Sequence, residues 1–275
     1  MKLKIVPSFL CFLLASVLAP SAYAVDTPFH VYGETRLLNQ PDLSQYGLKK
    51  LRMVYTGAFW KKGVDDFQLL PPRQRVIDFM KKNYATYAGL FVPDVEQWTL
   101  TGSNAQVETS VNKYVTLLGW IKSAAPRATV GYYGRPPKPD KRASLDPSSP
   151  KYRQWQAVNN LLAPLADAQG ALFPVMYTAD DNKELWIKAA TGKIRESKRL
   201  GKGKPVYVFI NPFYHNVAGP VQFRSKPIPK DYFLLQLKTL KRLGADGAII
   251  WNAKKLPWDN NAGWWLATKT FLGVK

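Results

Sequence analysis

Residues 88–98 read Ala88-Gly-Leu-Phe-Val-Pro-Asp-Val-Glu-Gln-Trp98, an apolar run that ends in two carboxylates separated by one residue. A short, almost wholly apolar segment is typical of a buried strand in a parallel sheet. Side chains at i and i+2 of an extended chain lie on the same side, so Asp94 and Glu96 are expected to face one space and Val95 the other. The stretch therefore predicts a parallel sheet with two acids at the end of one strand.

Two carboxyl groups in one dry site are costly to ionise together, and their pKa values tend to separate. One group then stays protonated as a general acid while its neighbour stays charged, which is the chemistry that breaks a glycosidic bond. The structural alternative is that Asp94 and Glu96 cap the following loop or take part in salt bridges.

Working outward from this stretch, strand-like and helix-like segments alternate along the chain. Strands are expected at residues 29–33, 51–59, 88–94, 128–133, 171–177, 205–211 and 247–251, and helices at residues 73–84, 106–124, 152–168, 182–199, 232–243 and 262–272. Seven such units in about 250 residues favour an α/β fold of the (β/α) TIM-barrel type, distorted, with seven or eight strands. A doubly wound open sheet is the alternative, but no Gly-x-Gly-x-x-Gly turn follows an early strand.

The first 24 residues have the three parts of a secretory signal peptide. Lys2 and Lys4 precede an apolar run over residues 5–18, and Ala22-Tyr-Ala24 provides a small-residue cleavage site. We expect cleavage after Ala24, a single barrel domain over residues 25–275, and a periplasmic or secreted protein. No later segment reaches the about 18 consecutive apolar residues of a membrane-spanning helix, so no transmembrane segment is expected after cleavage.

The excess of basic over acidic residues is the second strong indication of what this chain binds. The chain has 39 basic and 19 acidic residues, and loss of Lys2 and Lys4 with the leader lowers the formal charge from +20 to +18. Such a balance favours an anionic partner: a uronic-acid glycan, a phosphorylated envelope polymer, a membrane surface or nucleic acid. The simpler alternative is that the positive charge only keeps the protein soluble and attracts it weakly to the cell envelope. Export and the absence of a nucleic-acid-binding motif argue against nucleic acid.

The small numbers of cysteine and histidine residues limit the kinds of catalytic and metal sites that the chain can form. The single cysteine, Cys11, lies in the predicted leader, so neither a disulfide nor a cysteine nucleophile is expected in the mature chain. His30 and His215 are too few for a multi-histidine zinc site and argue against a Ser-His-Asp triad. We expect a monomer that uses no metal or cofactor.

In a parallel barrel, functional side chains follow the carboxyl ends of the strands. The polar and aromatic candidates at these ends, beyond the two acids, are Tyr132, Tyr133, Tyr177, Asn211, Tyr214 and Trp251. Either Asn211 or Tyr214 could line the cleft, and Trp251 could instead be core packing. Basic residues that follow strands, such as Arg135 and Lys254, are expected around this mouth, whereas the run from Lys193 to Lys204 precedes a strand and is expected at the opposite end.

Four segments resemble, in order, strands of the hyaluronidase-type family 56 glycoside hydrolases. The segments are Gly89-Leu-Phe-Val-Pro-Asp-Val-Glu-Gln-Trp98, with the family's Asp-x-Glu; Gly131-Tyr-Tyr133; Phe173-Pro-Val-Met-Tyr177, a Pro-x-x-Tyr strand; and Gly244-Ala-Asp-Gly-Ala-Ile-Ile-Trp251. The resemblance spans roughly residues 28–272 and indicates a distant, bacterial-type relative. The chain then departs from the animal members at Gly134-Arg-Pro-Pro137.

The resemblance implies a distorted barrel that cleaves beside N-acetylhexosamine units with retention of configuration. Glu96 would protonate the leaving oxygen, and the substrate's own acetamido oxygen would be the nucleophile. Asp94 would hold the acetamido N–H, Tyr177 would contact the acetamido oxygen, and Trp251 would form an apolar floor beneath the sugar. The resulting hypothesis is an exported glycoside hydrolase for an amino-sugar-containing, anionic polysaccharide. The alternative is a non-catalytic glycan-binding barrel of the cell envelope.

Overall fold

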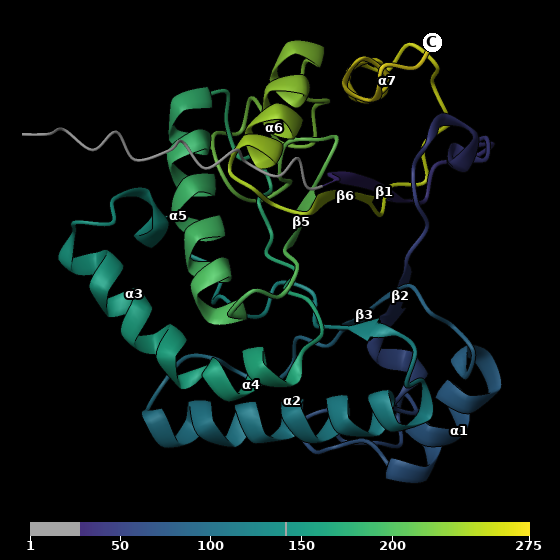
Figure 1. Cartoon of the computed structure of the whole chain (residues 1–275), viewed down its shortest axis with the longest axis vertical. Helices are drawn as coiled ribbons and strands as arrows, with labels where there is room; N and C mark the ends of the chain where they lie inside the picture. Colours follow the sequence, from purple (N-terminus) through teal and green to yellow (C-terminus); the bar gives the residue numbers. More distant parts are fainter. Residues whose placement is uncertain (1–27, 141) are drawn as a thin grey trace, which may run out of the picture.

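The structure is a computed structural model that describes residues 28–140 and 142–275, so the predicted signal peptide lies outside the described residues. Within them, seven α-helices and six β-strands form an α/β fold. The strands pair in parallel, as the sequence predicts. Figure 1 shows the helices arranged around the outside of the strands.

The strands form two sheets of three. In chain order they are β1 (His30–Thr35), β2 (Arg52–Tyr55), β3 (Leu90–Asp94), β4 (Thr129–Val130), β5 (Tyr207–Ile210) and β6 (Gly247–Asn252). One sheet has the order β1-β6-β5 and the other the order β2-β3-β4. The first and last strands of the chain are therefore neighbours, with His30 paired to Gly247 and Thr35 to Asn252 (Figure 1).

Seven α-helices connect the strands. They are α1 (Arg73–Tyr84), α2 (Asn104–Ala124), α3 (Pro150–Leu161), α4 (Ala163–Ala168), α5 (Lys183–Gly201), α6 (Lys230–Arg242) and α7 (Gly263–Leu272). Local chemistry explains several helix ends. Ser103 and Gln106 form a reciprocal capping box at the start of α2. Pro164, which has no backbone N–H, lies where the single helix predicted for residues 152–168 divides into α3 and α4. None of the helices in the described residues has the length and apolar character needed to cross a membrane.

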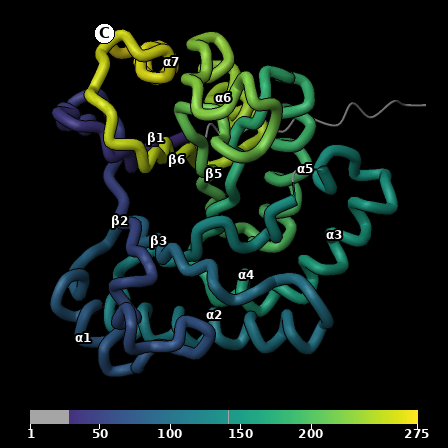
Figure 2. The backbone as a smooth tube through the Cα atoms, turned by 180° about the vertical axis from the view of Figure 1, so that it is seen from behind, coloured from purple at the N-terminus to yellow at the C-terminus, as the bar shows by residue number. Residues whose placement is uncertain are grey.

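Each sheet packs its outer face against its own helices. Apolar side chains of β1, β5 and β6 pack with α5, α6 and α7 in one cluster, whereas those of β3 and β4 pack with α1, α2 and α4 in another. Seen from behind, the β1-β6-β5 sheet lies beside α5 and α6, and β2 and β3 lie next to α1 and α2 (Figure 2). The helices thus cover the outer faces of both sheets, as expected for parallel strands.

The inner faces of the two sheets share a third cluster. Its members come from both sheets and from the segment before β5, and they include Tyr32, Val92, Phe173, Phe209 and Ile249. Isolated parallel bridges also join the sheets at both edges. Tyr32 bridges to Lys49 on one side, and residues 172–175 bridge to Tyr133 and to β5 on the other.

The strand count differs from the prediction of a seven- or eight-stranded barrel. The described residues contain six strands and no closed barrel, because the segment predicted as a strand over residues 171–177 forms only isolated bridges. Pro174 lies in its middle and supplies no N–H to a ladder, although its carbonyl accepts from the Phe209 N–H at 2.9 Å. The predicted strand over residues 51–59 is also shorter, since residues 56–58 turn into a 3-10 helix.

Candidate functional site

Asp94 ends β3, and its side chain is half-buried. Burial, together with the negative charge of Glu96, raises the pKa of Asp94 to about 6, while the positive charge of Arg135 opposes the rise. One carboxyl oxygen, Oδ1, is buried and has no hydrogen-bond partner among the described residues. An unpaired, buried carboxyl oxygen is costly, so this atom is well placed to accept a hydrogen bond from a ligand.

Glu96 lies two residues beyond Asp94 but is more exposed, with 58% of its side chain accessible. Its Oε1 accepts a hydrogen bond from the Arg135 guanidinium at 3.3 Å, and the same guanidinium donates to the Val95 carbonyl at 3.2 Å. The arginine is only 13% exposed and lies over the Tyr114 ring at 5.7 Å. Arg135 therefore fixes the direction of the Glu96 carboxyl group.

An aromatic wall stands beside the two acids. The Tyr177 and Trp251 rings stack with centroids 5.8 Å apart and an interplanar angle of 13°. The Tyr133 hydroxyl donates to the Tyr177 hydroxyl at 3.0 Å. The Trp251 indole N–H donates to the hydroxyl of Tyr55, at the end of β2, at 3.4 Å. Burial and the charge of Asp94 both raise the pKa of Tyr177, so the wall lies within the electrostatic reach of the acid.

Two cavities meet at this wall. The first, about 330 Å³, is lined by Asn211, Tyr214 and Trp251 among others, and the second, about 460 Å³, includes Glu96. Tyr133, Tyr177 and His215 line both. Six of the residues predicted from the sequence line one or both cavities: Glu96, Tyr133, Tyr177, Asn211, Tyr214 and Trp251. Asp94 lines neither cavity but is close enough for its charge to affect Tyr177.

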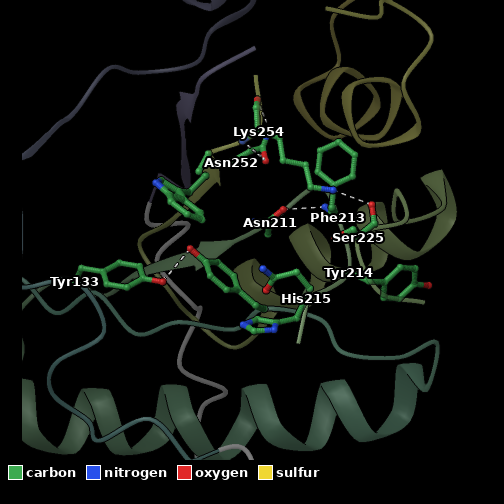
Figure 3. A pocket seen from close by; sticks show the side chains of 12 residues that line it. Tyr133, Asn211, Phe213, Tyr214, His215, Ser225, Asn252 and Lys254 are labelled. Atoms are coloured by element: carbon green, nitrogen blue, oxygen red, sulfur yellow. Dashed lines mark hydrogen bonds between the residues drawn. The ribbon is translucent and has the colours of Figure 1, made fainter. Parts of the chain in front are cut away.

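The first cavity is drawn in Figure 3. Asn211 follows β5, and its side-chain oxygen accepts from the Phe213 N–H at 2.9 Å. Tyr214 is buried, packs against Phe223 and points away from Tyr133. Lys254 lies 4.2 Å over the Phe213 ring and donates to the Ser225 carbonyl at 2.8 Å. Of the two alternatives after β5, Asn211 is the one whose side chain lies nearer the aromatic wall, because Tyr214 turns outward.

Tyr132 is not part of this site. Its side chain is fully buried, and its hydroxyl donates to the Tyr114 carbonyl of α2 at 2.9 Å. Tyr132 and Tyr133 are adjacent in an extended segment, so their side chains point to opposite sides. The prediction that Tyr132 contacts substrate is therefore wrong, and its role is to pack β4 against α2.

The expectation for Lys193 is also wrong. The basic run from Lys193 to Lys204 was expected at the far end of the fold because it precedes a strand. Lys193 instead lies in the middle of α5 and lines the same cavity as Glu96 and Tyr177. Chain order fixes where a helix begins and ends, but the direction of a side chain near its middle depends on helix packing.

No protein-family model matches the chain, and no curated protein matches its sequence. Solved structures do match: bee venom hyaluronidase in a monoclinic crystal has a TM-score of 0.59 and 15% identity, over 88% of this chain and 95% of that one. Bee venom hyaluronidase in complex with a hyaluronic acid tetramer has a TM-score of 0.60 and 15% identity, over 88% and 94%. The chain shares the hyaluronidase fold. A weaker match is an engineered protein, with a TM-score of 0.50 and 10% identity, over 84% of this chain and 54% of that one.

Within this hyaluronidase-like fold, two site residues were missed by the sequence reasoning. Tyr55 could have been found, because it ends a strand next to β3 and so falls under the same rule as Asp94. Lys193 carried no such signal, because a helical lysine in a basic run is ordinarily a solvated surface residue. Across residues 28–140 and 142–275, no three His, Cys, Asp or Glu side chains come together as a metal-binding group.

Proposed function

We propose that this chain is a glycoside hydrolase that cleaves an N-acetylhexosamine-containing polysaccharide. The observation that carries the proposal is the placement of two acids, Asp94 half-buried and Glu96 exposed, beside a wall of Tyr133, Tyr177 and Trp251 with a cavity on each side. Stacked aromatic rings suit the apolar face of a sugar, and carboxyl groups suit acid–base chemistry at its glycosidic oxygen.

Glu96 is the general acid in this proposal. Arg135 binds its Oε1, and Oε2 has no hydrogen-bond partner within the described part of the chain, which leaves this second oxygen to carry the proton. As the bond between C1 and the leaving oxygen breaks, the proton passes from Glu96 to that oxygen. In the second half of the reaction the same carboxylate takes a proton from a water molecule. The water oxygen attacks C1 as the bond between C1 and the acetamido oxygen breaks, and the Glu96 acid is restored.

Asp94 and Tyr177 act on the acetamido group. The buried Oδ1 of Asp94 accepts from the acetamido N–H and turns the acetamido oxygen toward C1, where it attacks as the leaving group departs. The Tyr177 hydroxyl, held by Tyr133, donates to the same oxygen. Trp251 lies beneath the ring. This substrate-assisted course retains configuration at C1 without a carboxylate nucleophile on the protein, unlike the usual pair of carboxylates.

The barrel itself is part of the proposal. The bridges at both sheet edges and the cluster shared by both inner faces support a distorted barrel in which the two sheets face one interior. The site then lies at the carboxyl ends of β3, β4 and β6, where barrel enzymes carry their chemistry. The excess of basic residues supports an anionic polysaccharide, and the leader-like N-terminus supports export to the periplasm or beyond.

One observation favours a second function, a non-catalytic glycan-binding protein. The Arg135 guanidinium forms an ion pair with Glu96 Oε1 at 3.3 Å, so part of this carboxyl group is already engaged by the protein. If substrate does not displace that contact, Glu96 does not reach the glycosidic oxygen, and the cavities bind a glycan without cutting it.

Replacement of Glu96 by glutamine separates the two functions. The purified protein, Glu96→Gln and the control Glu108→Gln are incubated with N-acetylhexosamine polysaccharides, and new reducing ends are measured and identified by mass. Glu108 is exposed on α2, away from the site. We expect Glu96→Gln to lose activity by about 100-fold or more while it still binds the polysaccharide, and Glu108→Gln to keep full activity.

The same assay tests the acetamido step. Removal of acetyl groups from the polysaccharide leaves the linkage unchanged but deletes the nucleophilic oxygen, so cleavage is expected to stop. Unchanged reducing-end release by Glu96→Gln contradicts the role of this acid. Equal cleavage of acetylated and deacetylated chains contradicts the substrate-assisted course, and binding without cleavage by the unaltered protein supports the glycan-binding alternative.

A further inference from the structure

His215 is a half-buried imidazole that the proposed chemistry does not use. It lines both the cavity that contains Glu96 and the cavity that contains Trp251, which is drawn in Figure 3. Its ring lies beside that of Tyr177, with centroids 6.3 Å apart and an interplanar angle of 39°. A ligand that extends from one cavity to the other therefore passes this ring.

The backbone around His215 is held by the segment that carries Tyr177. The His215 N–H donates to the Thr178 carbonyl at 2.7 Å. The turn that follows packs against the same segment, because a Cβ atom added to Gly219, where φ is +82°, would lie 2.1 Å from the Ala179 carbonyl oxygen. The position of the His215 ring is thus tied to that of the aromatic wall.

The hydrogen bonds of the ring determine which of its nitrogen atoms carries the proton. Nδ1 accepts from the Val217 N–H at 3.1 Å and from the Ala218 N–H at 3.0 Å. A ring nitrogen that accepts hydrogen bonds has no proton of its own, so the neutral ring of His215 carries its proton on Nε2. Burial lowers the pKa of His215 below its ordinary value of 6.5, so the ring is neutral at pH 7.

The remaining group of the ring, Nε2–H, is a donor that the protein does not use. No residue in 28–140 or 142–275 forms a hydrogen bond with Nε2. The ring is not a general base in this form, because the turn occupies the lone pair of Nδ1 and a proton occupies Nε2. It offers a ligand one neutral N–H, which suits the uncharged oxygen of a sugar hydroxyl group.

We propose that His215 is a glycan-binding residue whose Nε2–H donates to a hydroxyl oxygen of the sugar that lies where the two cavities meet. The nature of the ligand, an N-acetylhexosamine glycan, rests on the proposed function, but the binding role does not require cleavage. The structural alternative is that His215 only closes the turn at residues 217 and 218. The two roles use different nitrogen atoms, so substitutions can separate them.

Asparagine and glutamine each reproduce one side of the imidazole ring. Asparagine places its side-chain oxygen near the position of Nδ1, so His215→Asn keeps the acceptor for the turn and removes the donor. Glutamine is longer and places its amide N–H near Nε2, so His215→Gln keeps a donor and removes the acceptor. The control is His30→Gln, because His30 begins β1 and contacts Lys49, at the end of the strand away from the site.

Affinity is measured by calorimetry in the Glu96→Gln background, so that no ligand is cut. The probes are a hyaluronic acid tetramer and an uncharged N-acetylglucosamine tetrasaccharide. We expect His215→Asn to weaken binding by about threefold to tenfold, as for the loss of one neutral hydrogen bond, and His215→Gln to keep part of the affinity. The factor for His215→Asn should be the same at about 0.05 and 0.5 M salt, because a neutral donor is not screened. Urea unfolding verifies that each variant folds.

Nitrogen NMR of the histidine ring gives a readout that a purely structural role would not change. The chain has two histidines, so His30→Gln leaves His215 as its only imidazole. At pH 7 we expect the ring of the free protein to carry its proton on Nε2. Addition of the oligosaccharide to the Glu96→Gln protein should shift the Nε2 signal and leave the Nδ1 signal in place.

The outcomes distinguish this inference from the proposed function. If the unaltered protein cleaves nothing but His215→Asn weakens binding, the proposed function fails and the role of His215 stands. Cleavage by the unaltered protein, with equal affinity in His215→Asn, overturns the role of His215 and supports the proposed function. The inference is also overturned by a ring proton on Nδ1, by equal losses of affinity in His215→Asn and His215→Gln, or by the absence of binding to both probes.

Discussion

The Asp94 carboxyl group lies between opposing electrostatic influences. Burial and the charge of Glu96 favour its protonated form, whereas Arg135 favours the charged form, and the net result is a pKa of about 6 instead of the ordinary 3.8. The folded protein therefore binds this proton more tightly than the unfolded chain does. The stabilisation that follows is complete below pH 3.8 and is lost as the pH rises through about 6.

Substitution of Asp94 by asparagine measures this effect, because asparagine has nearly the same shape and never ionises. The free energy of unfolding of Asp94→Asn, minus that of the unaltered protein, should increase by about 2.4 kcal/mol between pH 4 and pH 8, since one pKa unit corresponds to about 1.4 kcal/mol and part of the change already occurs below pH 4. Urea unfolding at several pH values gives the difference. The exposed Asp78, changed to asparagine, is the control. A difference for Asp94→Asn that does not depend on pH would sink the assignment.

At the level of single residues, the sequence predicts where side chains lie better than what surrounds them. Glu96, Tyr133, Tyr177 and Trp251 line the two cavities at the strand ends. Asp94 lines neither cavity, but its charge reaches Tyr177. The sequence could have separated Tyr132 from Tyr133, because in an extended segment only one of two adjacent side chains can face the site. The contact between Arg135 and Glu96 could not be predicted from the sequence, because it joins residues 39 positions apart and depends on how the loop with Arg135 folds.

Among the elements, α5 and the short 3-10 helix η3 (Ala143–Leu145) approach each other closely at Gly192. A Cβ atom added to Gly192 of α5 would lie 1.9 Å from the Ser144 carbonyl oxygen, which is backbone and cannot move aside cheaply. Glycine at this position therefore lets η3 rest directly on α5. The contact also holds the loop with Asp140 against the cavity that Lys193 lines.

Replacement of Gly192 by alanine tests this packing. We expect Gly192→Ala to lower the free energy of unfolding by about 2 kcal/mol or more, as for other overpacked sites. Gly119, exposed in the middle of α2 with nothing near its added Cβ, is the matched control. Gly119→Ala should raise the free energy of unfolding by about 0.5–1 kcal/mol through helix propensity. Similar values for the two variants in urea unfolding would contradict the close fit.

Prolines explain why the predicted elements differ from those observed. Hydrophobic patterning located the helical run over residues 152–168 and the apolar segment over residues 171–177 in the right order. Pro164 divides the first into α3 and α4, and Pro174 lies within the second, which pairs only through isolated bridges. Periodicity reports which residues are buried, whereas the continuity of a ladder or helix also depends on each backbone N–H.

For the whole molecule, alternation of apolar strands and helices was enough to predict a parallel α/β fold. It was not enough to predict two separate three-stranded sheets, because the number of continuous strands depends on the local pairing at each edge. The cluster that includes Val92, Phe173 and Ile249 joins both sheets, so the order of the strands around the interior follows the chain even where the ladders stop. The residues of the site lie in the same order: Asp94 is the last residue of β3, Tyr133 follows β4, and Trp251 lies near the end of β6.

The charge of the whole chain is +20 in formal terms, and such a charge acts at long range. A field from many exposed lysines and arginines raises the encounter rate with a polyanion, and salt screens it over about 10 Å at 0.1 M. For the proposed activity, we expect kcat/KM on an anionic polysaccharide to fall by about tenfold between 0.05 and 0.5 M salt, and kcat/KM on an uncharged N-acetylhexosamine polysaccharide to change little. If both chains respond equally to salt, the basic excess does not guide substrate to this site.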